Sequence, residues 1–276
     1  MVQNNVNDVE KIRSSWKAKE VDEKASVDFW NLFAETQKEF KVPTFEDNAF
    51  LKLLKDNNML YPQGKALDVG CGTGKYSFAL SKSFKYLLGV DFSDDMLNLA
   101  REKSAQLDID NVDFQCCKWQ DFDIEKAGFY KEFDLVFAHM TPAINNACTL
   151  EKMIKASKGH CALSKPTKRV DSVTDKIMEY IGAKEYSTNS DSQVNNAIML
   201  LKGLGYEPQI ASEEQIWESK KETKLATKMH LNRAKQFVNI SKEDESDLIK
   251  FIKTFENDGY IYEKTNTTIS TIYWEV

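Results

Sequence analysis

The stretch Lys65–Asp91, KALDVGCGTGKYSFALSKSFKYLLGVD, predicts the fold of this chain. A short apolar run over 66–69 leads into a glycine-rich turn, a segment with helical spacing over 76–83, and a second apolar run that ends on Asp91. This order of strand, tight turn, helix, strand and acid is typical of a nucleotide-type site at the carboxyl edge of a parallel sheet. Glycines permit positive φ angles and let a ligand approach the main chain. The following helix offers that ligand unpaired N–H groups.

Two common phosphate-binding motifs do not fit this turn. A dinucleotide fingerprint needs a third glycine where Lys75 stands, and a P-loop needs Ser or Thr where Tyr76 stands. An acid opens the turn instead, and it would repel a pyrophosphate but suit a ligand that carries a cationic amine. The resulting pattern is D-x-G-x-G-x-G, formed by Asp68, Gly70, Gly72 and Gly74. An ordinary strand–helix turn is the alternative for a glycine cluster alone.

With this pattern the sequence resembles the class I S-adenosylmethionine-dependent methyltransferases over about residues 60–276. In that family the glycine turn cups the methionine part of the cofactor, and the acid that ends the second strand holds the ribose. The resemblance implies S-adenosyl-L-methionine as the cofactor. It also implies an α/β, Rossmann-like fold with a seven-stranded, mostly parallel sheet, helices on both faces, a helical lid and antiparallel C-terminal strands. The cofactor-binding residues that it implies are Asp68, Gly70, Cys71, Gly72, Gly74, Asp91, Phe92, Met96, Trp119, Asp121, Ala138 and Trp30.

Composition and charge narrow the class of protein. The 276 residues suffice for one large domain or a domain with a sizeable insert, and a net charge of -6 argues mildly against nucleic acid as the main partner. No apolar run approaches the ~20 residues that span a membrane, and the N-terminal residues lack the apolar core of a secretory signal. Five cysteines without zinc spacing suit a reducing cytosol, so we expect a cytoplasmic protein without a metal site. The oligomeric state is left open.

The N-terminal part is expected to form a helical cap over 1–58, ahead of a methyltransferase domain over 59–276. Residues 1–24 are polar and predict a mobile or loosely helical leader, whereas 27–40 has apolar residues at helical spacing. Trp30 and the following residues resemble the W…A-E segment with which small-molecule members of the family often start. This helix is therefore expected to cover the sheet, to close over the cofactor, or to do both.

The third strand, predicted over 112–116, leads to the side of the site that would hold adenine. The family usually places an acid just after this strand, but here that position falls on Lys118, with Trp119 and Asp121 following. Trp119 is a candidate stacking plate for adenine, because aromatic faces favour planar rings, or else a packing residue at the rim. Asp121 is a candidate replacement for the missing acid.

The fourth strand, predicted over 133–138, runs directly into His139. Residues just past a strand's carboxyl end line the crevice of such a sheet, so His139 is the candidate for contacting or deprotonating the substrate. The other interpretation is a structural histidine at a strand end. Nucleic-acid amino-methyltransferases carry an acid or Asn, then Pro-Pro and an aromatic residue here, and the sequence Thr141-Pro142-Ala143 lacks that signature.

The remaining pattern predicts the edge of the sheet and a lid. We expect a fifth strand over 159–164 that Pro166 stops, a sixth strand that begins at 205–208 and pairs with 215–219, and a final hairpin over 260–274. Helical spacing predicts helices over 171–182, 196–204, 223–237 and 242–255. We expect the segments at about 166–204 and 222–257 to pack over the crevice as a lid, with plain helical decoration as the alternative.

These observations predict an enzyme that transfers a methyl group to a small-molecule acceptor by in-line displacement in a lidded pocket. The sulfonium methyl is already electrophilic, so placement of the nucleophile and exclusion of water would supply most of the catalysis. Two alternatives stay open at this point: an S-adenosylmethionine-binding module without transferase activity, and methylation of a protein or nucleic acid. The methyl acceptor itself is not predicted.

Overall fold

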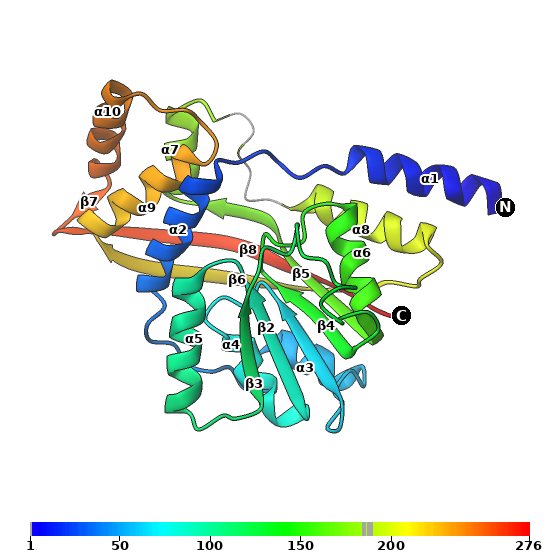
Figure 1. The fold of residues 1–276 in the computed structure, drawn as a ribbon. Coiled ribbons are helices and arrows are strands. Elements are labelled where there is room, and N and C mark those ends of the chain that lie inside the picture. The colour runs from blue at the N-terminus through cyan, green and yellow to red at the C-terminus, as the bar shows by residue number, and fades with distance from the viewer. Residues whose placement is uncertain (1, 184–185, 187–189) are drawn as a thin grey trace.

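One sheet runs through the molecule, with helices on both of its faces (Figure 1). The computed structural model describes residues 2–183, 186 and 190–276. The strands are β1 (Lys65–Val69), β2 (Tyr86–Asp91), β3 (Val112–Cys116), β4 (Phe133–His139), β5 (Ser157–Asp171), β6 (Gln209–Glu222), β7 (Glu256–Asn257) and β8 (Tyr260–Glu275). The helices are α1 (Val2–Ser15), α2 (Glu23–Glu35), α3 (Ala49–Asp56), α4 (Lys75–Leu80) with the 3₁₀ turn η1 (Ser81–Ser83), α5 (Asp94–Gln106), α6 (Ala147–Ala156), α7 (Thr174–Tyr180), α8 (Asp191–Gly203), α9 (Thr223–Lys235) and α10 (Lys242–Lys253).

The strand order confirms the predicted fold class. Among the described residues the sheet has eight strands in the order β3-β2-β1-β4-β5-β8-β6, with the two-residue β7 beside β8. Strands β1 to β5 pair in parallel, and β8 joins β5 and β6 antiparallel. The order reverses between β1 and β4, and ligands bind at such a switch point in open α/β sheets. The glycine turn after β1 and His139 at the end of β4 therefore border the expected crevice.

Strand β5 does not stop at Pro166, as the sequence suggested, but continues to Asp171. The partner strand β4 ends at His139, opposite Ser164. Beyond this point the edge of β5 that faced β4 has no neighbouring strand. The carbonyl of Pro166 points to that side, where it accepts a hydrogen bond from the backbone N–H of Ser190 at 2.8 Å. The nitrogen of Pro166 faces the same way, so proline removes no donor from the β8 ladder.

The C-terminal strands also differ from the prediction. Residues 209–222 form one strand, β6, and the expected pairing of 205–208 with 215–219 is wrong. The expected hairpin within 260–274 is wrong too, because β8 runs unbroken between β5 and β6. The hairpin turn lies upstream, at Asp258 and Gly259, whose positive φ angles of 50° and 79° join β7 to β8. Two consecutive residues with positive φ are what a tight two-residue hairpin requires.

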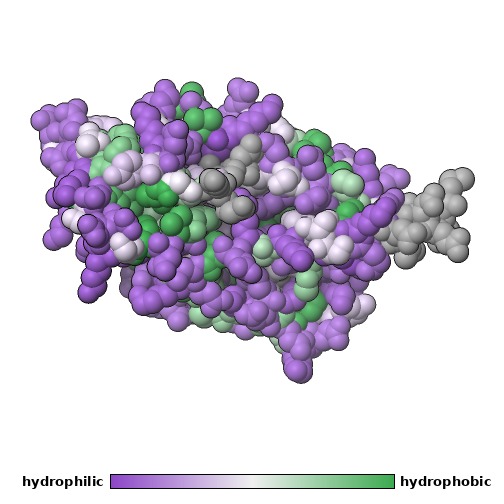
Figure 2. Space-filling view, turned by 90° about the horizontal axis from the view of Figure 1, so that it is seen from above, coloured by the Kyte–Doolittle hydropathy of each residue, from purple (hydrophilic) through white to green (hydrophobic). Residues whose placement is uncertain are grey.

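Two apolar clusters fill the faces of the sheet, and a third lies apart from them. The third consists of residues from α7, α9, α10 and the distal part of β8, around Ile177, Leu248 and Ile261. It lies where β5, β6 and β8 extend beyond the parallel strands (Figure 1). On the view from above, apolar surface gathers on the side of the molecule where α2, α7 and α9 lie (Figure 2). We call α7, α9, α10 and this strand extension the lid region.

The N-terminal helix α1 is packed on the molecule, unlike the loose leader expected from its polar sequence. Val9, Ile12 and Trp16 are buried in the cluster that also contains residues of α6 and α8. Gly203 of α8 allows this approach, since a Cβ there would stand 2.5 Å from Val9 Cγ2. Helix α8 was expected in the lid, but it packs with the sheet and α1. The division at residue 58 stays a prediction. No helix among the described residues has the length and apolar character needed to cross a bilayer.

Candidate active site

The glycine turn joins the ends of β1 and β2. The backbone N–H groups of Gly70 and Cys71 both donate to the carbonyl of Val90, at 2.7 and 3.1 Å. The N–H of Gly72 donates to Asp91 Oδ2 at 2.9 Å. The structure therefore brings the predicted turn and the predicted acid into direct contact.

The three glycines of the turn have positive φ angles for different local reasons. At Gly70 (φ +73°) a Cβ would lie 2.0 Å from Thr141 Oγ1, so the turn packs directly on Thr141, which lies just after β4. At Gly74 (φ +76°) a Cβ would lie 2.8 Å from the ring of Phe114, inside the protein. At Gly72 (φ +53°) a Cβ would meet no atom within 4 Å. Gly72 is thus the glycine that faces open space, whereas Gly70 and Gly74 serve packing.

Asp68 lies beneath the turn and is almost completely buried. It is 3% exposed, and the hydroxyl of Ser77 in α4 donates to its Oδ2 at 2.7 Å. Burial raises the pKa of Asp68 to about 7, the hydrogen bond from Ser77 opposes this, and the charge of Asp91 adds to it. Among the described residues no cationic side chain pairs with Asp68, which is why burial dominates its pKa.

Asp91 ends β2 with its carboxylate held by the main chain. Its Oδ1 accepts from the N–H of Ser93 at 3.0 Å, and its Oδ2 accepts from Gly72. Burial raises the pKa of Asp91, although these backbone hydrogen bonds lower it. Each carboxylate oxygen still has capacity for another donor, such as a ribose hydroxyl. Ser93 also caps α5 by accepting from the N–H of Met96 at 3.3 Å.

Four other predicted cofactor residues lie in or near the turn, in α5 or at the end of β4, without a hydrogen bond that marks them as ligand contacts. Phe92 is partly exposed beside Asp91. Met96 is buried and lies in the first turn of α5, and Ala138 is fully buried in the sheet. Cys71 is partly exposed in the turn, and burial raises the pKa of its thiol well above its ordinary value.

The adenine side departs from the prediction. Trp119 is only 2% exposed, and its indole Nε1 donates to the carbonyl of Thr149 at 3.1 Å. It stacks on Phe122 inside an apolar cluster, so in this structure it offers no face to a ligand. The packing interpretation therefore fits Trp119, and the stacking plate does not. A sequence does not reveal whether an aromatic ring after a strand turns inward or outward.

Neither candidate for the adenine-side acid position lies buried beside Asp91. Asp121 has a 72% exposed side chain that pairs with Lys118 at 3.2 Å. Lys118 also pairs with Glu23, at the start of α2, at 2.5 Å. These side chains thus tie the loop after β3 to the helix above it.

His139 is enclosed by aromatic rings at the end of β4. Its ring centroid lies 4.5 Å from that of Phe50 in α3 and 4.1 Å from that of Tyr76 in α4. Its Nδ1 is buried and has no partner among the described residues. Burial lowers the pKa of His139 to about 3, and the charge of Lys75 contributes to this. The ring is therefore neutral at physiological pH and a weak base, although its nitrogens can still form hydrogen bonds.

Lys165 of β5 is a polar residue of this region that the sequence analysis did not select. It is 3% exposed, and its Nζ donates to the carbonyl of Thr141 at 2.7 Å. Burial lowers the pKa of Lys165 to about 7. The sequence does place a lysine directly after the buried strand expected over 159–164. It was not selected because the strand was expected to end there, before Pro166.

Helix α2 connects the site to the lid region. Trp30 is partly exposed and packs edge-on against Phe29 and Phe33, with centroid distances of 5.4 and 5.6 Å. The next residue, Asn31, accepts from the hydroxyl of Ser93 at 3.0 Å. Trp30 therefore lies within one residue of a direct link to the Asp91 loop.

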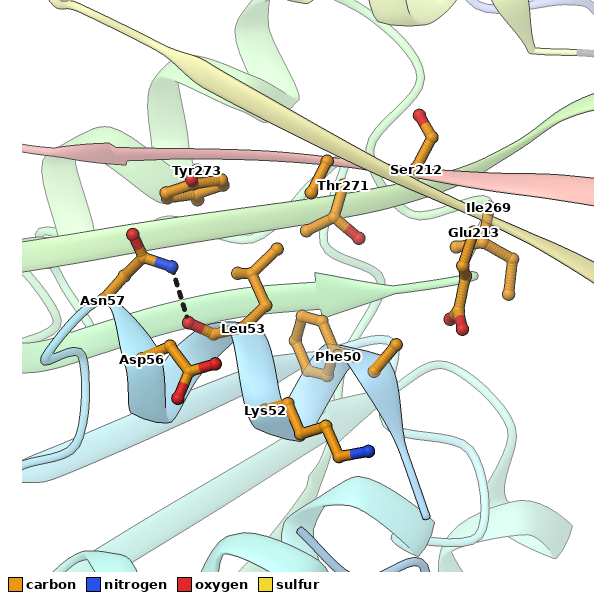
Figure 3. A pocket seen from close by; sticks show the side chains of 12 residues that line it. Phe50, Lys52, Leu53, Asp56, Asn57, Ser212, Glu213, Ile269, Thr271 and Tyr273 are labelled. Atoms are coloured by element: carbon orange, nitrogen blue, oxygen red, sulfur yellow. Dashed lines mark hydrogen bonds between the residues drawn. The ribbon is translucent and has the colours of Figure 1, made fainter. Parts of the chain in front are cut away.

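A shallow groove of about 310 Å³ lies elsewhere, between α3 and the strands β6 and β8 (Figure 3). Phe50 and Leu53 form its helix side, and Glu213, Thr271 and Tyr273 extend from the strands. None of the predicted cofactor residues lines it. Among the described residues no group of three His, Cys, Asp or Glu side chains could hold a metal ion.

Comparisons with known proteins agree with this fold. Protein BH2331 of Bacillus halodurans C-125 has a TM-score of 0.50 and 15% identity, over 83% of this chain and 99% of that one. A SAM-dependent methyltransferase of Aquifex aeolicus has a TM-score of 0.47 and 17% identity, over 65% of this chain and 89% of that one. At 15% identity the likeness to BH2331 concerns the fold alone, and no argument rests on the second structure, whose TM-score is lower.

A shorter match connects the chain to a curated protein. Demethylmenaquinone methyltransferase of Staphylococcus aureus strain MRSA252 is 49% identical over 47 residues, which are 16% of this chain and 20% of that protein. The chain thus matches only a fifth of that relative's length. The family model described as a methyltransferase domain is broader and matches residues 61–246. The chain therefore belongs to the methyltransferase family that its glycine turn predicted.

Proposed function

We propose that this chain is an S-adenosylmethionine-dependent methyltransferase that acts on a small-molecule acceptor. The observation that carries the proposal is the junction of Gly72 and Asp91. Their 2.9 Å hydrogen bond joins the turn to the acid, and the space beside Gly72 is open. A nucleoside bound there would have Asp91, which can accept hydrogen bonds from the ribose hydroxyls, on one side. On its other side would be the main chain at Gly72, with no side chain in the way.

The described residues fit this cofactor on two of its three parts. Asp91 offers carboxylate oxygens to the ribose hydroxyls, and Asp68 supplies the negative charge that the cationic amine of the methionine part requires. Trp119 is packed inside the protein in this structure, so we assign it no contact with the adenine part. When bound, the cofactor would supply an electrophilic sulfonium methyl group. The chain's own task would then be to orient the acceptor and exclude water.

An acceptor that is protonated at neutral pH would also need a base. His139, with a pKa of about 3, is too weak for this task, and we assign it a hydrogen-bonding contact to the acceptor. Lys165, with a pKa of about 7, is half deprotonated near neutrality and is the better candidate. Its Nζ lies 2.7 Å from the carbonyl of Thr141, the residue that packs on Gly70.

The proposed in-line transfer takes place under α2 and the lid region. Two contacts of α2 support this closure: the hydrogen bond from Ser93 to Asn31, and the backbone bond from Asp22 N to Gln236 O at 3.0 Å. A pocket closed in this way suits a small acceptor better than a polymer. Methylation of a protein or nucleic acid, and cofactor binding without transfer, are the competing functions.

Calorimetric titration with S-adenosylmethionine tests the cofactor site. The variant Asp91→Ala loses two hydrogen bonds to a charged group, each worth about 1.5–3 kcal/mol. Its affinity for S-adenosylmethionine should therefore be at least about 100-fold lower. The matched control is Asp110→Ala, which removes an exposed acid in the loop before β3. Unchanged affinity in Asp91→Ala would refute its role, and an absence of heat at millimolar ligand with the unmodified chain would refute the cofactor.

Release of S-adenosylhomocysteine then separates the competing functions. The chain is incubated with S-adenosylmethionine and either a metabolite fraction that has passed a small-pore membrane or the retained macromolecules. We expect product only with the small-molecule fraction. Product only with the retained fraction would favour a protein or nucleic acid as acceptor, and binding without product in either would favour the binding module.

A further inference from the structure

The chain has four arginines, and two of them, Arg169 and Arg233, have aromatic rings as partners. Arg13 pairs with Glu151 at 2.7 Å, and Arg101 donates to the carbonyl of Phe114 at 3.1 Å. Arg169 of β5 and Arg233 of α9 form no ion pair with a carboxylate among the described residues. An arginine that is partly buried without an anion is costly, so its presence in the lid region calls for an explanation.

Each of these two guanidinium groups lies against an aromatic ring. Arg169 Cζ is 5.3 Å from the ring centroid of Trp217 in β6, and Arg233 Cζ is 4.0 Å from that of Phe29 in α2. Cation–π contacts of this kind hold the planar group in place while its N–H donors remain available at the edges. One edge of Arg233 is used, because Nη1 donates to Gln236 Oε1 at 3.2 Å.

Three buried donors near these arginines have no acceptor among the described residues. They are Arg169 Nε, Tyr186 Oη and Gln236 Nε2. Tyr186 packs edge-on against Phe237, the residue after Gln236, at 5.3 Å between ring centroids. A buried donor without a partner costs about 1–3 kcal/mol, and such donors usually have an acceptor, so these three indicate that an acceptor is missing.

The charges of Arg169, Tyr186 and Arg233 influence one another. Burial lowers the pKa of Arg233, and the charge of Arg169 lowers it further, while Tyr186 and Asp171 oppose this. Burial raises the pKa of Tyr186 to about 12, with Arg233 opposing and Asp175 adding to the rise. Tyr186 therefore keeps its proton and can donate it to an acceptor.

Two carboxylates lie near the arginines, and three of their four oxygens accept hydrogen bonds from other groups. Asp171 Oδ1 accepts from the backbone N–H of Val173 and Thr174, and its Oδ2 accepts from the hydroxyl of Thr265 at 2.7 Å. Asp175 Oδ2 accepts from the N–H of Asp171 at 2.7 Å. They balance the overall charge, so a ligand here would be held by directed N–H and O–H donors more than by excess positive charge.

This cluster is connected to the proposed methyl-transfer site along two elements. On α2, Phe29 contacts Arg233 and Asn31 accepts from Ser93, so a single residue of α2 lies between the contact with the cluster and the contact with the Asp91 loop. On β5, Lys165 precedes Arg169 by four residues, a rise of at most about 13 Å because the strand is irregular between Thr167 and Val170. That length suits a small metabolite whose reacting end lies near Thr141. The apolar surface over α2, α7 and α9 lies on the same side of the molecule (Figure 2).

We propose that these donors bind an oxyanion, a carboxylate or phosphate group, of the methyl acceptor. We call the site the arginine recess, formed by Arg169, Tyr186, Arg233 and Gln236. The inference rests on the proposed function, since it assigns the acceptor's anionic end to the lid region. Two guanidinium groups and a phenol are the donor set that binds such a group with several charge-assisted hydrogen bonds.

Calorimetric titration with inorganic phosphate and, separately, with acetate tests the recess, at an ionic strength held constant with chloride. We expect saturable binding of one of them, which tells phosphate from carboxylate. Arg169→Gln and Arg233→Gln should each weaken it at least about tenfold, whereas the control Arg13→Gln should not. Tyr186→Phe removes a single hydroxyl, leaves the arginines in place, and should weaken binding by a smaller factor even if an arginine variant fails to fold.

The outcomes for the two proposals are distinct. The recess is refuted if neither anion saturates the unmodified chain, or if affinity is the same in all folded variants. S-Adenosylmethionine binding without anion binding removes the recess alone. Anion binding without S-adenosylmethionine binding removes the proposed function, and with it the assignment of the recess to a methyl acceptor.

Discussion

The cofactor region and the lid region satisfy their polar groups in different ways. Around the glycine turn, the acids are held by groups close in sequence: Asp91 by Gly72 and Ser93, and Asp68 by Ser77. In the lid region, buried polar groups depend on residues from distant elements, or they have no acceptor among the described residues, as in the arginine recess. The first region is a local motif that forms with its own backbone, while the second exists only once β5, β6, β8 and α9 have assembled.

The largest expected effect comes from Glu263, which joins three elements of the lid region. Its Oε2 accepts from Lys221 Nζ of β6 at 2.6 Å, and its Oε1 lies 2.7 Å from His230 Nε2 of α9. Glu263→Gln leaves Lys221 buried without its counter-charge, which should reduce the free energy of unfolding by about 3–5 kcal/mol in urea denaturation. Affinity for S-adenosylmethionine should change less than about twofold where the variant is folded. Unchanged stability, or a loss of cofactor affinity as large as in Asp91→Ala, would contradict the separation of the two regions.

The same carboxylate predicts how the lid region responds to acid. Burial alone would raise the pKa of Glu263, but the hydrogen bond and charge of His230 and the charge of Lys221 outweigh it and lower the pKa to about 2. An acid whose pKa falls on folding stabilises the protein above its unfolded pKa of about 4.5, and this stability is lost as the pH falls toward 2. In Glu263→Gln this component of the acid dependence should be absent.

The local character of the cofactor region explains why the sequence predicted it. The turn, Asp68 and Asp91 lie within 24 residues, and their spacing alone brings Gly72 onto Asp91. The family and the mostly parallel sheet follow from the same stretch. The sequence left both stacking and packing open for Trp119, because its indole bonds the carbonyl of Thr149, thirty residues away, and no pattern near Trp119 reveals this.

The lid region could be predicted only in its helices. Helical spacing located α7, α9 and α10, but the contact of Lys221 with Glu263 joins residues 42 positions apart. The length of β5 depends on where β4 stops, which is a property of the sheet and not of Pro166. The arginine recess likewise combines β5, α9 and Tyr186, which share no motif in the sequence.

A pair of glycine variants sharpens the comparison within the cofactor region. Both Gly70→Ala and Gly72→Ala place a side chain at positive φ, at similar backbone cost, but only Gly70→Ala would also bring a Cβ within 2.0 Å of Thr141 Oγ1. Overpacking of this kind costs about 1–3 kcal/mol, so Gly70→Ala should unfold at lower urea concentration than Gly72→Ala. Gly72→Ala should instead remain folded and lose cofactor affinity, because its methyl group enters the open space. Equal stability of the two variants would show that packing on Thr141 does not matter.

The smallest expected effect concerns Asp68 and its charge state. The pKa of Asp68 is raised to about 7, so the buried carboxyl is largely protonated at pH 6 and largely ionised at pH 8. A cationic ligand prefers the ionised form and would lower this pKa on binding. Affinity for S-adenosylmethionine should therefore be about tenfold weaker at pH 6 than at pH 8 in calorimetric titrations.

Other titrating groups can be separated from Asp68 in this window. The pKa of His139 is lowered by burial to about 3 and that of His160 is also lowered by burial, so both lie below their ordinary range. Lys165, with a pKa of about 7, gains a positive charge as the pH falls and would weaken binding in the same direction. Asp68→Asn removes the first contribution and Lys165→Met removes the second. If Asp68→Asn retains the full tenfold dependence while Lys165→Met abolishes it, the cationic part of the cofactor lies nearer to β5 than to the glycine turn, and the division between the two regions would need to be redrawn.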